Sequence, residues 1–170
     1  MIKTAAKKNY SSKMIKSPVG VLTLVASERG LAAILWENDK PNRVRLTITV
    51  KDASNPILDE AEKQLGEYFA GKRKKFALKL DFVGTEFQTK VWQALLTIPF
   101  GETRSYSQIA KQLGNAKAVR AVGAANGKNP ISIIAPCHRV IGASGALTGF
   151  AGGLKTKAQL LELEGIRLAA

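Results

Sequence analysis

The chain contains one cysteine and one histidine, and they are neighbours, Cys137 and His138. A thiol attacks electrophiles as its thiolate, and at a free pKa of about 8.5 only a small fraction is ionised at neutral pH. A base close to the sulfur therefore decides whether it reacts. The pair predicts a nucleophile with its base. The alternative is an inert cysteine buried in the core beside a surface histidine.

Positive charge is concentrated around this pair. The chain has 26 Lys and Arg against 13 Asp and Glu, which gives a net charge of +13. Residues 103–161 contain no acidic residue at all. The basic residues of this stretch are Arg104, Lys111, Lys117, Arg120, Lys128, Arg139, Lys155 and Lys157. A solvated surface that only aids solubility is one explanation, but a long acid-free basic stretch favours a polyanion partner such as a phosphate backbone.

Composition excludes several classes of protein. No apolar run reaches the ~18 residues that a membrane-spanning helix needs, and the lysine-rich N-terminus has no apolar core of a signal peptide. One cysteine permits no internal disulfide and no zinc site built on several thiolates. We therefore expect a cytoplasmic protein without a membrane partner and without a metal site.

The first half is expected to form a small α/β unit in which no residue pattern indicates chemistry. Its expected elements are a basic tail over 1–17, a hairpin of strands at 19–26 and 31–36, a half-buried strand at 44–50, a helix over 57–70 and a strand at 76–80.

The second half is expected to be mainly helical, and the Cys-His pair lies within it. Its expected elements are a helix capped by Thr85 that runs to about 98, a helix with a capping box at Ser105 that runs to 113, a helix over 116–125, an apolar strand at 131–135 that leads to Cys137, a glycine-rich loop over 142–153 and a helix over 155–164. The helices before and after the Gly114-Asn115 turn fit a helix-turn-helix.

The second helix of that pair is almost bare of side chains. Alanine and glycine dominate it, and Arg120 is its main long side chain. Tight packing on a neighbouring helix is one explanation; close approach to a nucleic acid groove, with one arginine that intrudes, is the other. If a nucleic acid is the partner, we expect its contacts at Lys117, Ala118, Arg120, Ala121 and Lys128.

Several segments, taken in order, make the chain resemble the methylated-DNA–protein-cysteine methyltransferases, also called O6-alkylguanine-DNA alkyltransferases. They are Phe87-Gln88, Val91-Trp92, Ile98-Pro99, Ser105-Tyr106, Arg120-Ala121-Val122-Gly123, Asn129-Pro130, Pro136-Cys137-His138-Arg139-Val140, Gly152-Gly153 and Glu164-Gly165. The resemblance implies an α+β fold, with an N-terminal ribonuclease-H-like α/β domain over 1–82. It implies a C-terminal helical domain with a winged helix-turn-helix over 83–170.

The resemblance also implies roles for single residues. Cys137 matches the nucleophile, His138 the base that acts through a water, Glu164 the carboxylate that orients the imidazole, and Asn129 a residue that ties the helix-turn-helix to the active-site turn. Arg120 matches the finger that fills the space left by a flipped nucleotide. The residues matched to the purine site are Tyr106, Val140, Phe150, Ala151 and Gly152.

The implied activity is repair of double-stranded DNA by transfer of the alkyl group of O6-alkylguanine to Cys137, after the nucleotide is flipped out. A thioether is stable and the chain has no second thiol, so the transfer is expected to be stoichiometric and to consume the protein. We expect a monomer that uses no cofactor. The sequence leaves open whether O4-alkylthymine is a second substrate.

One departure from the family pattern concerns Phe150, which stands where many members have tyrosine, so a hydroxyl is lost. Two other functions were weighed. A winged-helix protein that only binds DNA or flags lesions would lack the nucleophile, whereas Cys137 is present. A Cys-His hydrolase would need direct contact between the two side chains and an oxyanion site, and adjacent residues at a strand end point to different sides.

Overall fold

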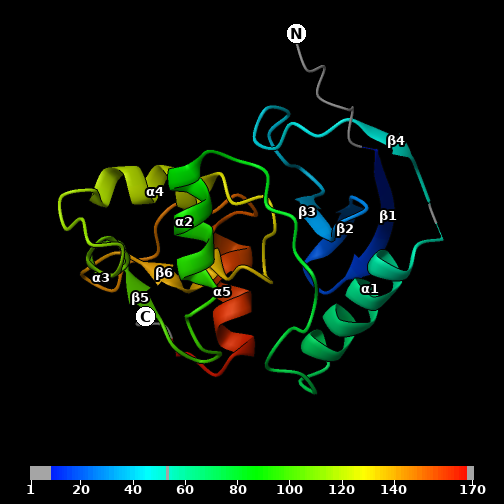
Figure 1. Ribbon diagram of the computed structural model, residues 1–170. Coiled ribbons are helices and arrows are strands. Elements are labelled where there is room, and N and C mark those ends of the chain that lie inside the picture. Colours follow the sequence, from blue (N-terminus) through cyan, green and yellow to red (C-terminus); the bar gives the residue numbers. More distant parts are fainter. Residues whose placement is uncertain (1–8, 53, 168–170) are drawn as a thin grey trace, which may run out of the picture.

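The computed structural model describes residues 9–52 and 54–167 and shows two halves side by side (Figure 1). The N-terminal half is a sheet with one long helix, and the C-terminal half is a group of short helices. The expected α+β fold class is confirmed. The elements are β1 (Tyr10–Ser17), β2 (Gly20–Ala26), β3 (Leu31–Trp36), β4 (Ile48–Val50), α1 (Pro56–Phe69), α2 (Glu86–Leu95), β5 (Arg104–Ser105), α3 (Tyr106–Gln112), α4 (Val119–Gly127), a 3-10 helix (Cys137–Arg139), β6 (Val140–Ile141) and α5 (Leu154–Leu163).

The N-terminal sheet has the strand order β3-β2-β1-β4, in which only β1 and β4 run parallel. The predicted hairpin of β2 and β3 is confirmed. Helix α1 begins after Asn55, whose side chain accepts hydrogen bonds from the first free backbone amides of the helix. It packs on the sheet through a buried stripe that includes Leu58, Leu65 and Tyr68.

Strand β3 is the edge of the sheet that meets the C-terminal half. The amide of Ile34 donates to the carbonyl of Pro130 over 2.8 Å, and Ile34 forms an isolated bridge with Ile131. The segment that leads to Cys137 thus covers an edge whose backbone groups would otherwise lack partners. The N-terminal sheet therefore fixes the position of the chain just before the nucleophile.

Helices α2 and α3 of the C-terminal half begin where the sequence predicts. Thr85 and Ser105 each form a full capping box, at the start of α2 and of α3. Trp92 on α2 donates from Nε1 to the carbonyl of Ala125 on α4 over 2.8 Å, which joins α2 to the helix pair. Strand β5 pairs with β6, so the entry to α3 is tied to the residues that follow Cys137.

Two expectations for the N-terminal half were wrong. Residues 10–17 form strand β1, not a tail, because they pair antiparallel with β2 and bury Tyr10 and Ile15. Lys13 on this strand also pairs with α1, with its Nζ 3.1 Å from Asp59 and 2.5 Å from Glu62. Residues 1–8 of the expected tail lie outside the described part. The segment 76–80 forms only an isolated bridge, Leu31 to Leu80, rather than a strand.

Three other elements differ in extent or type. The strand expected over 44–50 is confined to β4, and the helix expected over 116–125 begins at Val119 because the carbonyl of Asn115 accepts the Ala118 amide in a turn. The strand expected over 131–135 is a tight turn. Its residue Ile133 has a φ of 74°, and the amide of Ala135 donates back to the carbonyl of Ile131.

Candidate active site

Cys137 begins a 3-10 helix directly after this turn. The side chain of Asn129 holds the turn from both ends: its Oδ1 accepts from the Ile131 amide over 3.1 Å, and its Nδ2 donates to the Ala135 carbonyl over 2.8 Å. These bonds replace those of a strand, which is why an apolar, β-branched segment turns instead of extending. The backbone amide of Asn129 donates to the carbonyl of Asn126 on α4 over 3.2 Å, so Asn129 lies between the helix pair and the turn, and its assigned role remains a prediction.

The Cys137 side chain is buried, with 3% of the residue exposed. Burial raises the pKa of the thiol, because the thiolate loses water. Hydrogen bonds with the side chains of Asn129 and Ser132 and the positive charges of Arg43 and Lys157 act in the opposite direction. The sulfur therefore lies in a dry but electropositive site, a setting that allows a thiolate to form when a base takes the proton.

His138 is fully buried and contacts Glu164, with 2.6 Å between Nε2 and Oε2. Burial lowers the pKa of His138, even though the bond to Glu164 opposes the shift, so the ring is neutral at physiological pH. A carboxylate can only accept, so Nε2 carries the proton and Nδ1 keeps its lone pair. Nδ1 is buried and has no hydrogen-bond partner among the described residues. The imidazole is thus held with an unprotonated nitrogen, Nδ1, that can accept a proton.

Glu164 accepts hydrogen bonds from both halves of the molecule. Arg139 donates from Nε over 2.7 Å, the amide of Gly101 donates over 3.2 Å, and the hydroxyl of Tyr68 on α1 donates over 2.6 Å. Burial alone would raise the pKa of Glu164, but the bonds from His138, Arg139 and Tyr68 hold it at about 2. The carboxylate therefore stays ionised and keeps the imidazole in place.

Two side chains of this cluster were not predicted. Tyr68 has no signal in the sequence, because its partner is 96 residues away. Lys157 on α5 is fully buried, and its Nζ donates to the carbonyls of Val140 and Thr148 over 2.6 and 3.2 Å. A signal did exist for Lys157: it lies on the buried stripe of α5, three and four residues before Leu160 and Leu161. Burial lowers the pKa of Lys157 to about 8.

A groove of about 510 Å³ lies between α4, the loop that follows β3 and the glycine-rich loop, and two of the predicted purine-site residues, Phe150 and Ala151, line it. Phe150 packs edge-on against Trp36, with ring centroids 5.4 Å apart. A Cβ at Gly152 would stand 2.9 Å from both of these rings, so only glycine fits there.

The other three predicted purine-site residues, which are Gly152, Val140 and Tyr106, are not among the residues that line this groove. Val140 is buried in β6. The hydroxyl of Tyr106 is bonded to the hydroxyl of Thr148 over 2.6 Å. Either hydroxyl can be the donor of this bond, so Tyr106 can accept from Thr148 and donate its own proton to a ligand.

The predicted DNA-contact residues lie together on and around α4. Arg120, Ala121 and Lys128 are exposed, as is Lys117 before the helix, while Ala118 is half-buried at its N-cap. The exposed alanines leave the backbone of α4 open to close approach, so the bare helix is not explained by packing alone.

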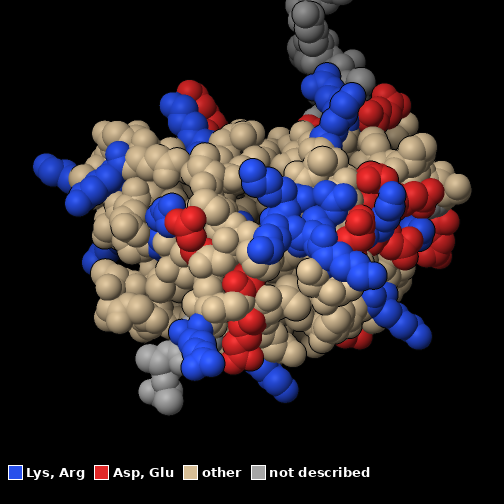
Figure 2. All heavy atoms as spheres, turned by 90° about the horizontal axis from the view of Figure 1, so that it is seen from below, with Lys and Arg blue, Asp and Glu red and all other residues tan. Residues whose placement is uncertain are grey.

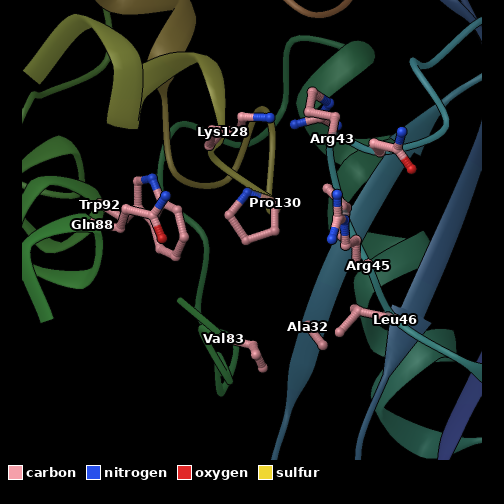
Figure 3. A pocket seen from close by; sticks show the side chains of 11 residues that line it. Ala32, Arg43, Arg45, Leu46, Val83, Gln88, Trp92, Lys128 and Pro130 are labelled. Atoms are coloured by element: carbon pink, nitrogen blue, oxygen red, sulfur yellow. The ribbon is translucent and has the colours of Figure 1, made fainter. Parts of the chain in front are cut away.

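A second cavity, of about 330 Å³, separates the two halves beside the end of α4 (Figure 3). Arg43 and Arg45, from the segment after β3, line one side, and Trp92 of α2 lines the other (Figure 3). Arg43 donates to the carbonyl of Asn129 over 2.5 Å and is paired with Asp39 over 2.6 Å. Arg43, a third unpredicted residue, thus connects the N-terminal half to the turn that carries the nucleophile.

Over the described ranges, 9–52 and 54–167, no helix is long and apolar enough to cross a membrane. The same ranges contain no group of three or more His, Cys, Asp or Glu side chains arranged to hold a metal ion. The groups that the site presents are the Cys137 thiol, the His138 imidazole, the Glu164 carboxylate and the Lys157 ammonium.

Two family models match the chain. The ribonuclease-like domain of 6-O-methylguanine DNA methyltransferase matches residues 11–82, and the DNA-binding domain of the same family matches residues 86–166.

Curated relatives and solved structures match the chain over most of its length. The methylated-DNA–protein-cysteine methyltransferase of Mycobacterium leprae is 51% identical over 154 residues, which cover 89% of this chain and 90% of the relative. That of Methanosarcina acetivorans is 50% identical over 155 residues, with 89% and 96% covered. The crystal structure of Mycobacterium tuberculosis OGT in complex with DNA superposes with a TM-score of 0.79 at 49% identity, with 92% of each chain covered.

Proposed function

This chain belongs to the 6-O-methylguanine DNA methyltransferase family, and we propose that it repairs double-stranded DNA by moving the alkyl group of O6-alkylguanine onto Cys137. The activity is that of a methylated-DNA–[protein]-cysteine S-methyltransferase that acts once and is consumed. The observation that carries the proposal is the buried His138–Glu164 pair beside Cys137, which leaves a lone pair on Nδ1 without a protein partner.

In the proposed reaction, His138 Nδ1 takes the proton of the Cys137 thiol through one water molecule, and Glu164 stabilises the imidazolium that results. The thiolate attacks the alkyl carbon, so a sulfur–carbon bond forms as the carbon–O6 bond breaks, and the electron pair of that bond stays on the guanine. The ammonium of Lys157 stabilises the thiolate before the attack. Tyr106, whose hydroxyl can accept from Thr148, donates to the purine anion.

The reaction requires the base outside the helix, because O6 of a paired guanine lies within the stack. An alkylated guanine pairs poorly, so its extrusion costs less than that of a normal base. Arg120 is exposed on α4 and is proposed to occupy the vacated space, while the bare face of α4 approaches the groove. Lys117 and Lys128 are proposed to contact phosphates, so affinity falls with added salt and depends little on sequence.

The remaining expectations stay proposals. We assign the domain boundary to residues 82 and 83, and we expect a monomer that acts in the cytoplasm. The DNA-bound relative supports DNA as the partner, and the lesion is assigned from the family. O4-alkylthymine is a second substrate to be tested alongside O6-methylguanine.

The decisive experiment is intact-protein mass spectrometry with peptide mapping, after incubation with a duplex that carries one O6-methylguanine. We expect a gain of one methylene unit on Cys137, at most once per protein molecule, and no gain for Cys137→Ser. The matched control is Ser144→Ala in the exposed part of the glycine-rich loop, which should react as the wild type does. DNA binding without any gain in mass would contradict the proposal and would leave a protein that only recognises the lesion.

A further inference from the structure

A third groove, of about 650 Å³, opens between the two halves and has no part in the chemistry described above. One wall comes from residues 74–80, after α1, and the other from residues 96–100, after α2. Pro136 and Arg139 close it toward the active site. It shares none of its lining residues with the groove beside α4, so a ligand here would not occupy the purine site.

The floor of this groove is apolar and partly open to water. Leu96 is 39% exposed, and Leu78, Leu80 and Phe100 are only partly buried. The ring of Phe100 is flanked by cations, with Lys74 Nζ 5.6 Å and the Arg139 guanidinium 5.9 Å from its centroid. Apolar side chains that remain exposed in a concave site are typical of a surface that binds another molecule.

The segment that forms one wall of the groove is strongly basic. Lys74 and Lys75 line the groove, and Lys72, Arg73 and Lys79 lie within the same eight residues of sequence, with no acidic residue among them. Arg73 is paired with Glu67, but no carboxylate pairs with Lys74 or Lys75 in the part of the chain that the structure describes. The segment after α1 lies at the lower end of Figure 1, and Figure 2, which views that end, shows Lys and Arg gathered at its centre.

We infer that this groove docks an acidic segment of another protein, one in which a run of carboxylates is followed by an apolar side chain. The carboxylates pair with Lys74 and Lys75 at the rim, and the apolar side chain covers Leu96 and Phe100 on the floor. Charge complementarity orients the incoming segment and speeds its association, and the apolar contact makes the binding specific. A partner held here leaves the surface of α4 clear, because α4 lies at the opposite end of the molecule (Figure 1).

A second duplex fits these observations less well. Phosphates gain from the lysines, but a polyanion leaves the leucines and the ring on the floor exposed to water. An acidic segment with an apolar end both pairs with the lysines and covers the apolar floor of the groove. The two ligands differ in one measurable way: only the peptide loses affinity when its apolar residues are replaced by alanine.

The test uses the full chain and a fluorescein-labelled peptide in which a run of aspartates precedes Leu-Leu-Phe, with binding followed by fluorescence anisotropy. We expect the double variant Lys74→Glu/Lys75→Glu to bind about tenfold more weakly or worse, and Leu96→Asn to weaken binding several-fold. The matched control, Lys16→Glu/Lys63→Glu, removes the same charge from two exposed lysines of the N-terminal half that do not line the groove, and it should bind almost as the wild type does. Alkyl transfer by each variant reports that it is folded.

Three results would overturn the inference. Equal weakening in the groove variant and the control variant would mean that the net charge alone attracts the peptide. Equal binding of a peptide with alanine in place of Leu-Leu-Phe would remove the apolar part of the site. Displacement of the peptide by undamaged duplex, together with weaker duplex binding by Lys74→Glu/Lys75→Glu, would assign the surface to nucleic acid.

Discussion

The two halves of the molecule contribute to the active site in different ways. The C-terminal half carries the groups proposed to react, and they stand in short motifs that a reader of the sequence can find. The N-terminal half carries no such motif, yet three of its side chains hold the site. Tyr68 donates to Glu164, Trp36 donates to Ser132 over 3.1 Å, and Arg43 donates to the carbonyl of Asn129.

The difference follows from what each group has to do. A nucleophile and its base must lie within a few ångströms of each other, so neighbouring residues supply them efficiently. A group that only restricts orientation can come from any element that packs against the site, and it needs one well-placed donor. The N-terminal half is therefore more than a scaffold: it buries the site and fixes three of its hydrogen bonds. The predictions below test whether the C-terminal half supplies the reacting groups and the N-terminal half only orients them.

Among variants that keep Cys137, the largest loss of transfer rate is expected for Glu164→Gln. The change removes the carboxylate that accepts hydrogen bonds from His138 and Arg139. The imidazole then loses both its orientation and the negative charge that stabilises its protonated form. Single-turnover transfer should slow by about 10²–10⁴-fold. Glu162→Gln, an exposed neighbour on α5, should react at the wild-type rate. Similar rates for both variants would remove Glu164 from the mechanism.

A smaller loss, of about tenfold, is expected for Lys157→Met, because the variant loses the positive charge close to the Cys137 thiol. The pKa of Lys157 is lowered to about 8, so the wild type carries this charge below pH 8 and loses it above. The ratio of wild-type to variant rates should therefore narrow as the pH rises from about 7 to about 9. Lys155→Met, exposed on the same helix, is the control. A ratio that is constant with pH would show that Lys157 only holds the loop in place.

Most of the helices and strands, and the candidate pair Cys137 and His138, could be predicted from the sequence, because both depend on local patterns. The capping boxes at Thr85 and Ser105 place the starts of two helices correctly, and the stripe of α1 places its buried face. Patterns of this kind are set by the first few backbone amides and by the period of the helix. The roles assigned to Cys137 and His138 remain predictions, although the structure places both side chains in one buried site.

What could not be predicted depends on contacts between distant parts of the chain. The segment before Cys137 is apolar and β-branched, which favours a strand. The side chain of Asn129 instead forms hydrogen bonds with both ends of the segment and closes it into a turn. Tyr68 looks like an ordinary core residue of α1 until Glu164 is placed against its hydroxyl. The boundary at residues 82 and 83 likewise remains a prediction.

A modest effect with a specific signature is expected for Tyr68→Phe, the first test of the N-terminal half. The hydroxyl competes with His138 for Glu164, so its removal leaves more of the negative charge to the imidazole. The pKa of His138 should rise, and because only the neutral ring is a base, the acid limb of the pH–rate profile should move to higher pH by about half a unit. The rate should fall by about threefold on the acid limb, where the ring titrates, and stay nearly unchanged at neutral pH, where the ring of either protein is neutral.

The control for this variant is Tyr10→Phe, since Tyr10 is also buried in the N-terminal half but lies in a separate core cluster. It should leave the pH–rate profile unchanged. A lower rate for Tyr68→Phe with an unmoved acid limb would mean that Tyr68 supports the fold alone, and the N-terminal half would then act only as a scaffold.

The smallest effect is expected for Trp36→Phe, which removes the bond from the indole to the hydroxyl of Ser132 and part of the ring contact with Phe150. One buried hydrogen bond contributes about 1 kcal/mol net, so the Tm should fall by about 2–4 °C, and transfer should slow by less than about threefold, because the indole reaches the Cys137 thiol only through Ser132. Ser132→Ala removes the other partner of the same bond, so the double variant should cost less than the sum of the two single ones. Strict additivity would show that the bond does not couple the halves. A rate loss for Trp36→Phe as large as that for Lys157→Met would show that the N-terminal half acts on the chemistry directly, and the contrast between the two halves would no longer hold.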